Sequence, residues 1–372
     1  MPSLRLCAKC HKRLKIYCEL VQPESCMICS GLLWKIDEIA EEIAEKLKEY
    51  EFETFSVGSR IYGSLKALED YLNELIGLNG KSLKIQFNRE LSRKLAARLN
   101  VKSTHQDPDV TIIYDLENPS FEIQIRPLYI YGRYKKRVRG ISQTRWLCTR
   151  CDGKGCEVCN WTGKKYPTSV EELIGEAMLE IFKGTGYILH GSGREDVDAR
   201  MLGNGRPFIM EIQNPKRRFV DLKEVERYVN EKAKGKVVVF DLKFAKPRDV
   251  EYLKSAGFRK VYRAKVEFGR EVGREELEKA VKAISDTVIE QRTPIRVLHR
   301  RADLLRRKRT YGIEILLHRG RVAVLKIEAN SGLYIKELVS GDEGRTKPSL
   351  SEVLGVPARV MKLDVIEVKG GL

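Results

Sequence analysis

Four cysteine pairs of the form Cys-x-x-Cys constrain this chain more than any other feature, since they hold eight of its nine cysteines. In a reducing compartment such pairs bind metal rather than form disulfides. The first two pairs are separated by fifteen residues, a spacing typical of a zinc ribbon with a closed, tetrahedral, structural site. The expected ligands are Cys7, Cys10, Cys26 and Cys29. Cys18 lies between the pairs and is left over.

The other two pairs lie close together, with glycines around the inner cysteines. Glycine lets a backbone turn tightly, so both pairs can reach one ion. We therefore expect a second structural zinc, with the ligands Cys148, Cys151, Cys156 and Cys159. Two alternatives stay open: one pair alone binds the ion, or a partner completes the site. Neither cluster has the open, three-ligand arrangement of a catalytic zinc.

The chain carries a large excess of positive charge. Its 372 residues include 69 basic and 52 acidic ones, which gives a net charge of +17. Nucleic acid is the partner that such a charge favours, and a membrane surface is the weaker alternative because no amphipathic anchor is present. No apolar run approaches the roughly 20 residues of a membrane span. The first residues lack a signal-peptide core, so we expect a cytoplasmic protein.

The length is enough for two or three domains. After the first cysteines, a helical pattern begins at Lys35. Short strand-like runs follow around Glu53–Ser56 and Lys84–Phe87, before a helical segment. Two further strands are expected on either side of a turn at Asn118-Pro119. In the next stretch, Pro127–Arg139, aromatic residues alternate with basic ones, a pattern that suits nucleic acid but that a solvated basic edge would share.

The main domain boundary is expected near Tyr166-Pro167, just before a helix with a capping box at Ser169–Glu172. Further helices and strands alternate to the C-terminus. Between them, Gln291–Arg309 is the most cationic stretch and is interpreted as a path for phosphates, although a solvated face would look similar.

The glycine-rich segment Gly191–Phe208 contains aspartates, a glutamate and arginines, and an apolar strand follows it. Glycines allow tight turns and close approach to a ligand, so we interpret the segment as an active-site loop. A solvated surface loop is the main alternative. A calcium loop built on Asp196 and Asp198 is weaker, because arginines stand where further oxygen ligands are needed.

Several motifs resemble those of pseudouridine synthases. Gly193-Arg-Glu-Asp196 is similar to their catalytic motif, in which an arginine stands two places before the aspartate, and Gly332-Leu-Tyr-Ile-Lys336 is similar to a later motif, with Leu333 in place of its usual threonine. Asp109–Lys136 looks like the end of a THUMP domain, an RNA-binding module of tRNA-modifying enzymes. Together these segments resemble the archaeal tRNA pseudouridine synthases that modify uridines 54 and 55 of the T arm.

This resemblance implies roles for particular residues. Asp196 is the nucleophile, and Arg194, if it pairs with Asp196, would keep that carboxylate charged. Tyr262 stacks on the flipped base, Ile335 and Leu363 form apolar walls, Lys336 orients the aspartate, and Tyr334 is a further substrate contact. The isomerisation involves no redox change, so no cofactor is needed for catalysis.

The resemblance also implies an α+β fold whose catalytic domain has a mixed, largely antiparallel sheet flanked by helices. We expect zinc knuckles at 1–34, a THUMP-like domain at 35–140, a second knuckle and linker at 141–166 and the catalytic domain at 167–372. The expected partner is tRNA, bound by a monomer without a small-molecule cofactor.

Other RNA-modifying enzymes are disfavoured by motifs that the sequence lacks. A methyltransferase needs a glycine-rich loop after its first strand, and a sulfur-transfer enzyme needs an ATP-binding Ser-Gly-Gly-x-Asp loop. A zinc deaminase needs His-x-Glu, and none of the five histidines has that context. A non-catalytic tRNA-binding protein stays open as an alternative from a different class.

Overall fold

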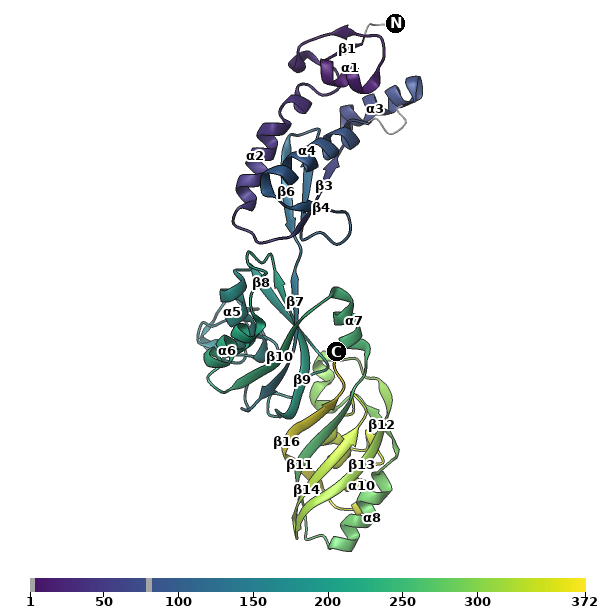
Figure 1. Ribbon diagram of the computed structural model, residues 1–372. Coiled ribbons are helices and arrows are strands. Elements are labelled where there is room, and N and C mark those ends of the chain that lie inside the picture. Colours follow the sequence, from purple (N-terminus) through teal and green to yellow (C-terminus); the bar gives the residue numbers. More distant parts are fainter. Residues whose placement is uncertain (1–3, 78–81) are drawn as a thin grey trace. The chain divides into compact units, whose positions relative to one another are not determined.

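The computed structural model describes residues 4–77 and 82–372, which divide into two compact units. Unit 1 contains the chain up to residue 128 together with residues 182–185 and 213–219, and unit 2 contains the remainder. Figure 1 shows both units, coloured along the sequence. The chain therefore crosses between the units several times, and each unit is described by itself.

Unit 1 begins with a small knuckle that carries the first cysteines. Strand β1 (Arg5–Leu6) pairs in parallel with β2 (Glu19–Leu20), and helix α1 (Ala8–Leu14) separates them in the sequence. Two 3-10 turns follow at Pro23–Ser25 and Leu32–Trp34. The buried Leu6 and Leu33 join this knuckle to the hydrophobic core of unit 1.

The rest of unit 1 is a sheet with the strand order β4-β3-β5-β6, covered by helices. The strands are β3 (Thr54–Arg60), β4 (Lys102–Ser103), β5 (Val110–Asp115) and β6 (Ser120–Ile125). The helices are α2 (Ile36–Leu47), α3 (Gly63–Ile76) and α4 (Leu83–Leu99). Helix α4 packs on β3, and α2 packs on α4, because both helices bury an apolar stripe.

The structure confirms the helix expected from Lys35 and the two strands around Asn118-Pro119, which are β5 and β6. The strand expected at Lys84–Phe87 is wrong, since these residues form the first turns of α4. That helix starts early because the Ser82 hydroxyl accepts a hydrogen bond from the backbone N–H of Ile85 (3.2 Å), as an N-cap does.

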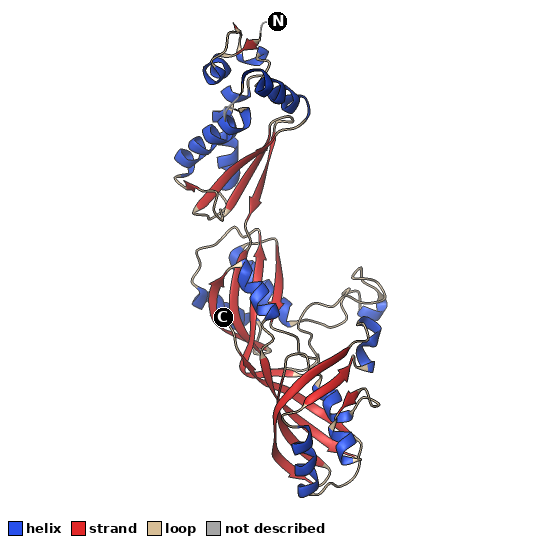
Figure 2. Cartoon of the chain, turned by 90° about the vertical axis from the view of Figure 1, so that its right-hand side faces the viewer, coloured by secondary structure: helices blue, strands red, loops and turns tan. Residues whose placement is uncertain are grey.

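Unit 2 is built on a mixed sheet with the strand order β10-β7-β9-β16-β11-β14-β13-β12-β15, and β8 pairs with β9. Figure 2 draws the strands in red. The strands are β7 (Leu128–Lys136), β8 (Gly186–Gly191), β9 (Arg200–Gln213), β10 (Val237–Ala245), β11 (Arg259–Phe268), β12 (Val288–Arg292), β13 (Leu305–Arg319), β14 (Val322–Ala329), β15 (Thr346–Lys347) and β16 (Ala358–Lys369). Strand β11 pairs antiparallel with β14 and β16, whereas β9 runs parallel to β16. The expected mixed, largely antiparallel sheet is thus confirmed.

Helices flank this sheet. They are α5 (Val170–Phe182), α6 (Leu222–Lys232), α7 (Pro247–Ser255), α8 (Arg274–Ile284), α9 (Ile335–Ser340) and α10 (Leu350–Leu354). Helix α6 packs on β10, α8 on β13, and α9 on β16. The predicted cap of α5 is present, because the Ser169 hydroxyl accepts from the backbone N–H of Glu172 (3.1 Å) and donates to its carboxylate (2.8 Å). Among the described helices none is long and apolar enough to cross a membrane.

Two segments differ from the expectations. Strand β7 pairs with β10 in unit 2, although its residues were expected in the THUMP-like domain. The glycine-rich segment is a loop only up to Ala199, because its second half already belongs to β9. In that half the backbone of Gly203 has φ +55 and lies against the carbonyl of Ile366, where a side chain would clash.

Candidate active site

A cavity of about 650 Å³ lies in unit 2, at the loop between β8 and β9. Its lining comes from that loop, from β11 and β16, from the cationic stretch after β12 and from the start of α9. All seven residues predicted as catalytic or substrate-binding line it, namely Arg194, Asp196, Tyr262, Tyr334, Ile335, Lys336 and Leu363. The structure therefore brings together side chains that are up to 169 positions apart in the sequence.

The carboxylate of Asp196 is held by two cations. An Arg296 nitrogen lies 3.1 Å from it and the Lys336 ammonium 3.3 Å, and the Asp196 side chain is 32% exposed. Arg296 also binds the buried carboxylate of Glu337 at 2.6 Å, so one guanidinium connects the loop to α9. Burial alone would lower the pKa of Arg296, but the hydrogen bond and charge of Glu337, with the charge of Asp196, raise it above its ordinary value. Arg296 is therefore permanently charged.

The expected pairing of Arg194 with Asp196 is wrong. Arg194 instead donates to the Thr144 hydroxyl (3.2 Å), and its guanidinium lies over the Trp146 ring, 6.0 Å from the centroid. Arg300 lies over the same ring at 4.5 Å. Arg296 was not singled out from the sequence as the partner of Asp196, because a pairing across one hundred positions leaves no local pattern.

A buried network supports the loop from behind. Glu195, next to Asp196, accepts hydrogen bonds from Arg206 (2.8 Å) and from the Tyr134 hydroxyl (2.9 Å). The ammonium of Lys136 donates to the backbone carbonyl of Asp196 at 3.1 Å. The side chains of Glu195, Arg206 and Lys136 are at most 1% exposed. Burial lowers the pKa of Lys136, while the charge of Glu195 acts in the opposite direction.

This network corrects one prediction about the aromatic and basic stretch Pro127–Arg139. The sequence pattern favoured stacking on bases and contact with phosphates, but Tyr134 and Lys136 are completely buried. In both residues the polar group points to the loop between β8 and β9. Lys136 holds the backbone of the loop and Tyr134 holds the side chain of Glu195, so neither residue presents a surface to RNA.

The apolar wall of the cavity consists of Tyr262, Ile335 and Leu363, which are at most 8% exposed as whole residues. Tyr262 on β11 pairs across the sheet with Val365, close to Leu363 on the neighbouring strand. Burial raises the pKa of Tyr262 to about 12, with smaller effects from Arg206 and Asp196. The phenol is therefore protonated at neutral pH, and its ring offers a flat apolar surface beside Asp196.

The turn before α9 is held by a residue that sequence reasoning missed. The Gln291 side chain accepts from the backbone N–H of Tyr334 (2.8 Å) and donates to its carbonyl (3.1 Å). Leu333, which stands where the resemblance would have threonine, is buried and 4% exposed. The Tyr334 hydroxyl accepts from Arg301 at 2.8 Å. Gln291 thus positions the start of the helix that carries Ile335 and Lys336.

The cationic stretch expected to bind phosphates contributes strongly to the cavity. Its lining includes Arg296, Arg300, Arg301, Arg306 and Lys308. In the part of the chain that the structure describes, only the first of these forms an ion pair. The cavity therefore has an excess of positive charge, as a site for a polyanion requires.

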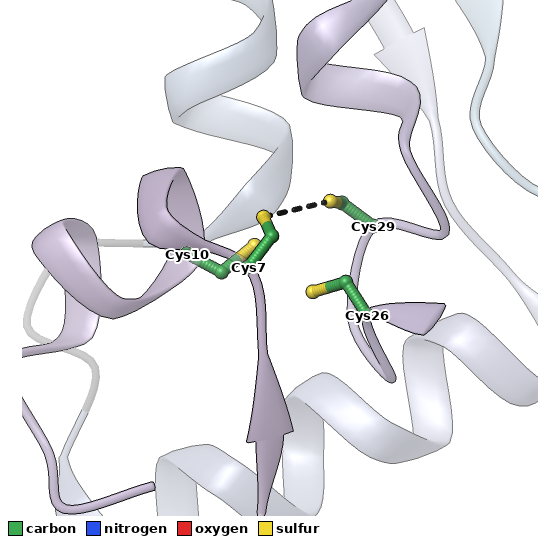
Figure 3. A group of neighbouring side chains, drawn as sticks. All are labelled: Cys7, Cys10, Cys26 and Cys29. Carbon is green, nitrogen blue, oxygen red and sulfur yellow. Dashed lines mark hydrogen bonds between the residues drawn. The ribbon is translucent and has the colours of Figure 1, made fainter. Parts of the chain in front are cut away.

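The four cysteines of each cluster converge. The sulfur atoms of Cys7, Cys10, Cys26 and Cys29 lie within 4.8 Å of one another (Figure 3), and so do those of Cys148, Cys151, Cys156 and Cys159. A tetrahedral zinc with bonds of about 2.3 Å needs sulfur separations of about 3.8 Å. The separations of 3.6 Å for Cys7 and Cys29 and 3.9 Å for Cys148 and Cys156 agree with that geometry. Each cluster offers four sulfur ligands to one metal ion, so no ligand from a partner is needed to complete the site.

Comparisons with known proteins agree with this architecture. The family model "Pus10, C-terminal" matches residues 129–369, and "Pus10 THUMP domain, archaeal" matches residues 39–115. The tRNA pseudouridine synthase Pus10 of Archaeoglobus fulgidus is 53% identical over 98% of this chain and 100% of its own length. That of Methanopyrus kandleri is 47% identical over 93% and 81%.

A chain in the crystal structure of a Cbf5-Nop10-Gar1 complex is a more distant likeness. It is 18% identical, with a TM-score of 0.34 over 54% of this chain and 45% of that one. The two family models and the two archaeal relatives together cover both units of the structure. The chain therefore belongs to the Pus10 family of tRNA pseudouridine synthases, which are isomerases.

Proposed function

We propose that this chain converts uridine to pseudouridine at positions 54 and 55 of the tRNA T arm, with Asp196 as the nucleophile. The observation that carries the proposal is the placement of the Asp196 carboxylate. It lies in a cationic cavity between two positive side chains and shares that cavity with the buried wall of Tyr262, Ile335 and Leu363. Its relatives bear the name tRNA pseudouridine synthase, which supports tRNA as the substrate.

The reaction explains why one carboxylate suffices. The bond from C1′ of the ribose to N1 of uracil breaks, a bond from C1′ to C5 forms, and the C5 proton is replaced by one on N1. No electrons are gained or lost overall. An aspartate is ionised at neutral pH and can attack the nucleotide as a nucleophile. Arg296 and Lys336 fix the direction in which the Asp196 oxygens point.

The target uridine has to leave its stack before Asp196 can reach it. A flipped base has two flat faces, and the neutral phenol ring of Tyr262 would stack on one of them. Ile335 and Leu363 would pack against its edges and exclude water. Tyr334 is a further contact at the rim, with its hydroxyl turned to Arg301. The unpaired arginines around the cavity would neutralise phosphates of the T arm.

We also propose that both cysteine clusters hold structural zinc. All four donors in each cluster are sulfur atoms, which suit zinc, and four protein ligands leave no open position for substrate. In the second cluster, backbone N–H groups of Gly155 and Cys156 donate to the sulfur atoms of Cys151 and Cys159 at 3.2 Å. Such donors stabilise thiolates. The zinc would supply folding energy, and no step of the isomerisation would pass through it.

The test of the proposed function is a map of pseudouridine in a tRNA transcript that carries no modifications. We expect pseudouridine at positions 54 and 55 after incubation with the purified chain. A transcript with cytidine at both positions serves as the control and should gain none. Pseudouridine at other positions only would contradict the proposed target positions 54 and 55. No pseudouridine at all would favour the alternative of a non-catalytic tRNA-binding protein.

A further inference from the structure

One cation in the catalytic cavity has no acidic partner although it is buried. Lys260 on β11 is 5% exposed and lines the cavity together with Asp196 and Tyr262. Its ammonium group donates to the carbonyl of Phe258 (3.1 Å) and to the Ser331 hydroxyl (3.0 Å). Within residues 4–77 and 82–372 it forms no ion pair. A lysine has three N–H donors, so one donor has no protein acceptor among the described residues.

The surroundings of Lys260 are positive rather than negative. Burial, and then the charges of Arg206 and Lys308, lower the pKa of Lys260 to about 7. Arg206 is neutralised by Glu195, whereas Lys308 on β13 forms no ion pair in the described part of the chain. A β-carbon built on Gly332 would lie 3.5 Å from the Lys308 side chain, so Lys308 passes next to Ser331, the residue that Lys260 binds.

The catalytic loop runs directly over this position. A β-carbon built on Gly193 would lie 3.4 Å from the Lys260 ammonium and 3.4 Å from Arg206, and the Gly193 backbone has φ +79. Glycine thus lets the loop lie against the two cations, three residues before Asp196. An unpaired buried charge is costly, and a purely structural role would be filled better by an apolar side chain of similar size.

We propose that Lys260 and Lys308, with the Ser331 hydroxyl, form a binding site for one phosphate group of the RNA backbone next to the flipped uridine. Phosphate offers several acceptor oxygens and negative charge, which match the free donors and the excess of positive charge at this position. The site would hold the target nucleotide in place beside Asp196, so Lys260 is a substrate-binding residue and not the nucleophile. This inference rests on the proposed function, because it presumes that RNA occupies the cavity.

The test measures tRNA binding in an Asp196→Asn background, so that no turnover is required. The tRNA is assembled with one neutral methylphosphonate linkage, placed in turn at each phosphate around position 55. With Lys260 intact, one linkage should weaken binding about tenfold. In Lys260→Met the same linkage should have no further effect, because the contact is already lost. Lys265→Met, on the exposed face of the same strand, is the matched control and should keep the full effect.

Lys308→Met provides a second variant if Lys260→Met does not fold, and it should reduce the effect of the same linkage. Independent, additive losses in the Lys260 and Lys308 variants at every linkage would overturn the phosphate site. The outcome is separate from that of the proposed function. Coupling in the Asp196→Asn background, with no pseudouridine formed by the unchanged chain, would remove the catalytic assignment alone. Pseudouridine formed by the unchanged chain, with no coupling in that background, would remove the phosphate site alone.

Discussion

Asp196 forms an ion pair with Arg296, 3.1 Å away and one hundred positions later in the chain, and none with Arg194, two positions before it. Because Arg296 also binds Glu337 at 2.6 Å, this guanidinium connects the loop between β8 and β9 to α9. The same helix contributes Lys336 to Asp196. The position of the carboxylate therefore depends on contacts with segments that are distant in the sequence.

Arg296→Met should lower the rate of pseudouridine formation about 100-fold, since Asp196 loses its orientation and a misplaced nucleophile is a poor one. Glu337 also loses its partner and is left as a buried carboxylate. Single-turnover kinetics measure the rate. Arg307→Met, an exposed residue outside the cavity, is the matched control and should react at the normal rate. Equal rates in both variants would contradict the orienting role of Arg296.

Glu195→Gln should destabilise the protein by about 3 kcal/mol, because it leaves the charge of Arg206 buried without a counter-charge. Thermal or denaturant unfolding of the purified variant gives the value. Glu176→Gln, on the exposed side of α5, should change the free energy of unfolding by less than about 0.5 kcal/mol. A Glu195 variant as stable as the Glu176 variant would mean that the pair does not support the loop.

These contacts also show how far the sequence could predict the site. The motif residues were assigned to one site because the resemblance names them, and the structure places Asp196, Tyr262 and Lys336 around one cavity. Arg296 and Lys260 could not be assigned from the sequence, since their roles depend on which side chains meet across the sheet. A cationic stretch has no pattern that distinguishes the arginine pairing with Asp196 from the other arginines that line the cavity.

In the fold, too, local features could be predicted from the sequence and long-range pairings could not. Helix α2 and the pair β5 and β6 follow from their periodicity and from a turn, which are local properties. Residues 84–87 were predicted as a strand because four residues are too few to distinguish the periodicity of a helix from that of a strand. Strand β7 was placed in the wrong structural unit for a different reason: its partner, β10, comes about one hundred residues later, and no local signal indicates that pairing.

Metal analysis of the purified chain should find about two zinc ions per molecule. Cys7→Ser should lower the value to about one, because it removes a ligand of the first cluster. Cys18→Ser is the matched control: this cysteine belongs to neither cluster, and its sulfur lies 3.3 Å from a His11 nitrogen. About two ions are expected in that variant. A value near zero in the unchanged chain would contradict both zinc assignments.

The proposed phosphate site should make tRNA affinity depend on pH. In the protein without bound tRNA, Lys260 is charged below about pH 7 and can bind phosphate, whereas above this pH it loses its proton. A bound phosphate favours the charged form, so binding at higher pH requires proton uptake and affinity falls as pH rises from 7 to 9. The difference in tRNA affinity between the unchanged chain and Lys260→Met separates the titration of Lys260 from that of other groups. A difference that stays constant with pH would contradict it.

The most direct test of the central claim is the pseudouridine content of tRNA after incubation with Asp196→Asn. This variant keeps the size of the side chain and removes its charge. The account predicts no pseudouridine at positions 54 and 55, with tRNA binding within about twofold of normal, whereas Asp286→Asn on the exposed surface should modify tRNA fully. Pseudouridine formed by Asp196→Asn at the normal level would contradict the assignment of Asp196 as the nucleophile.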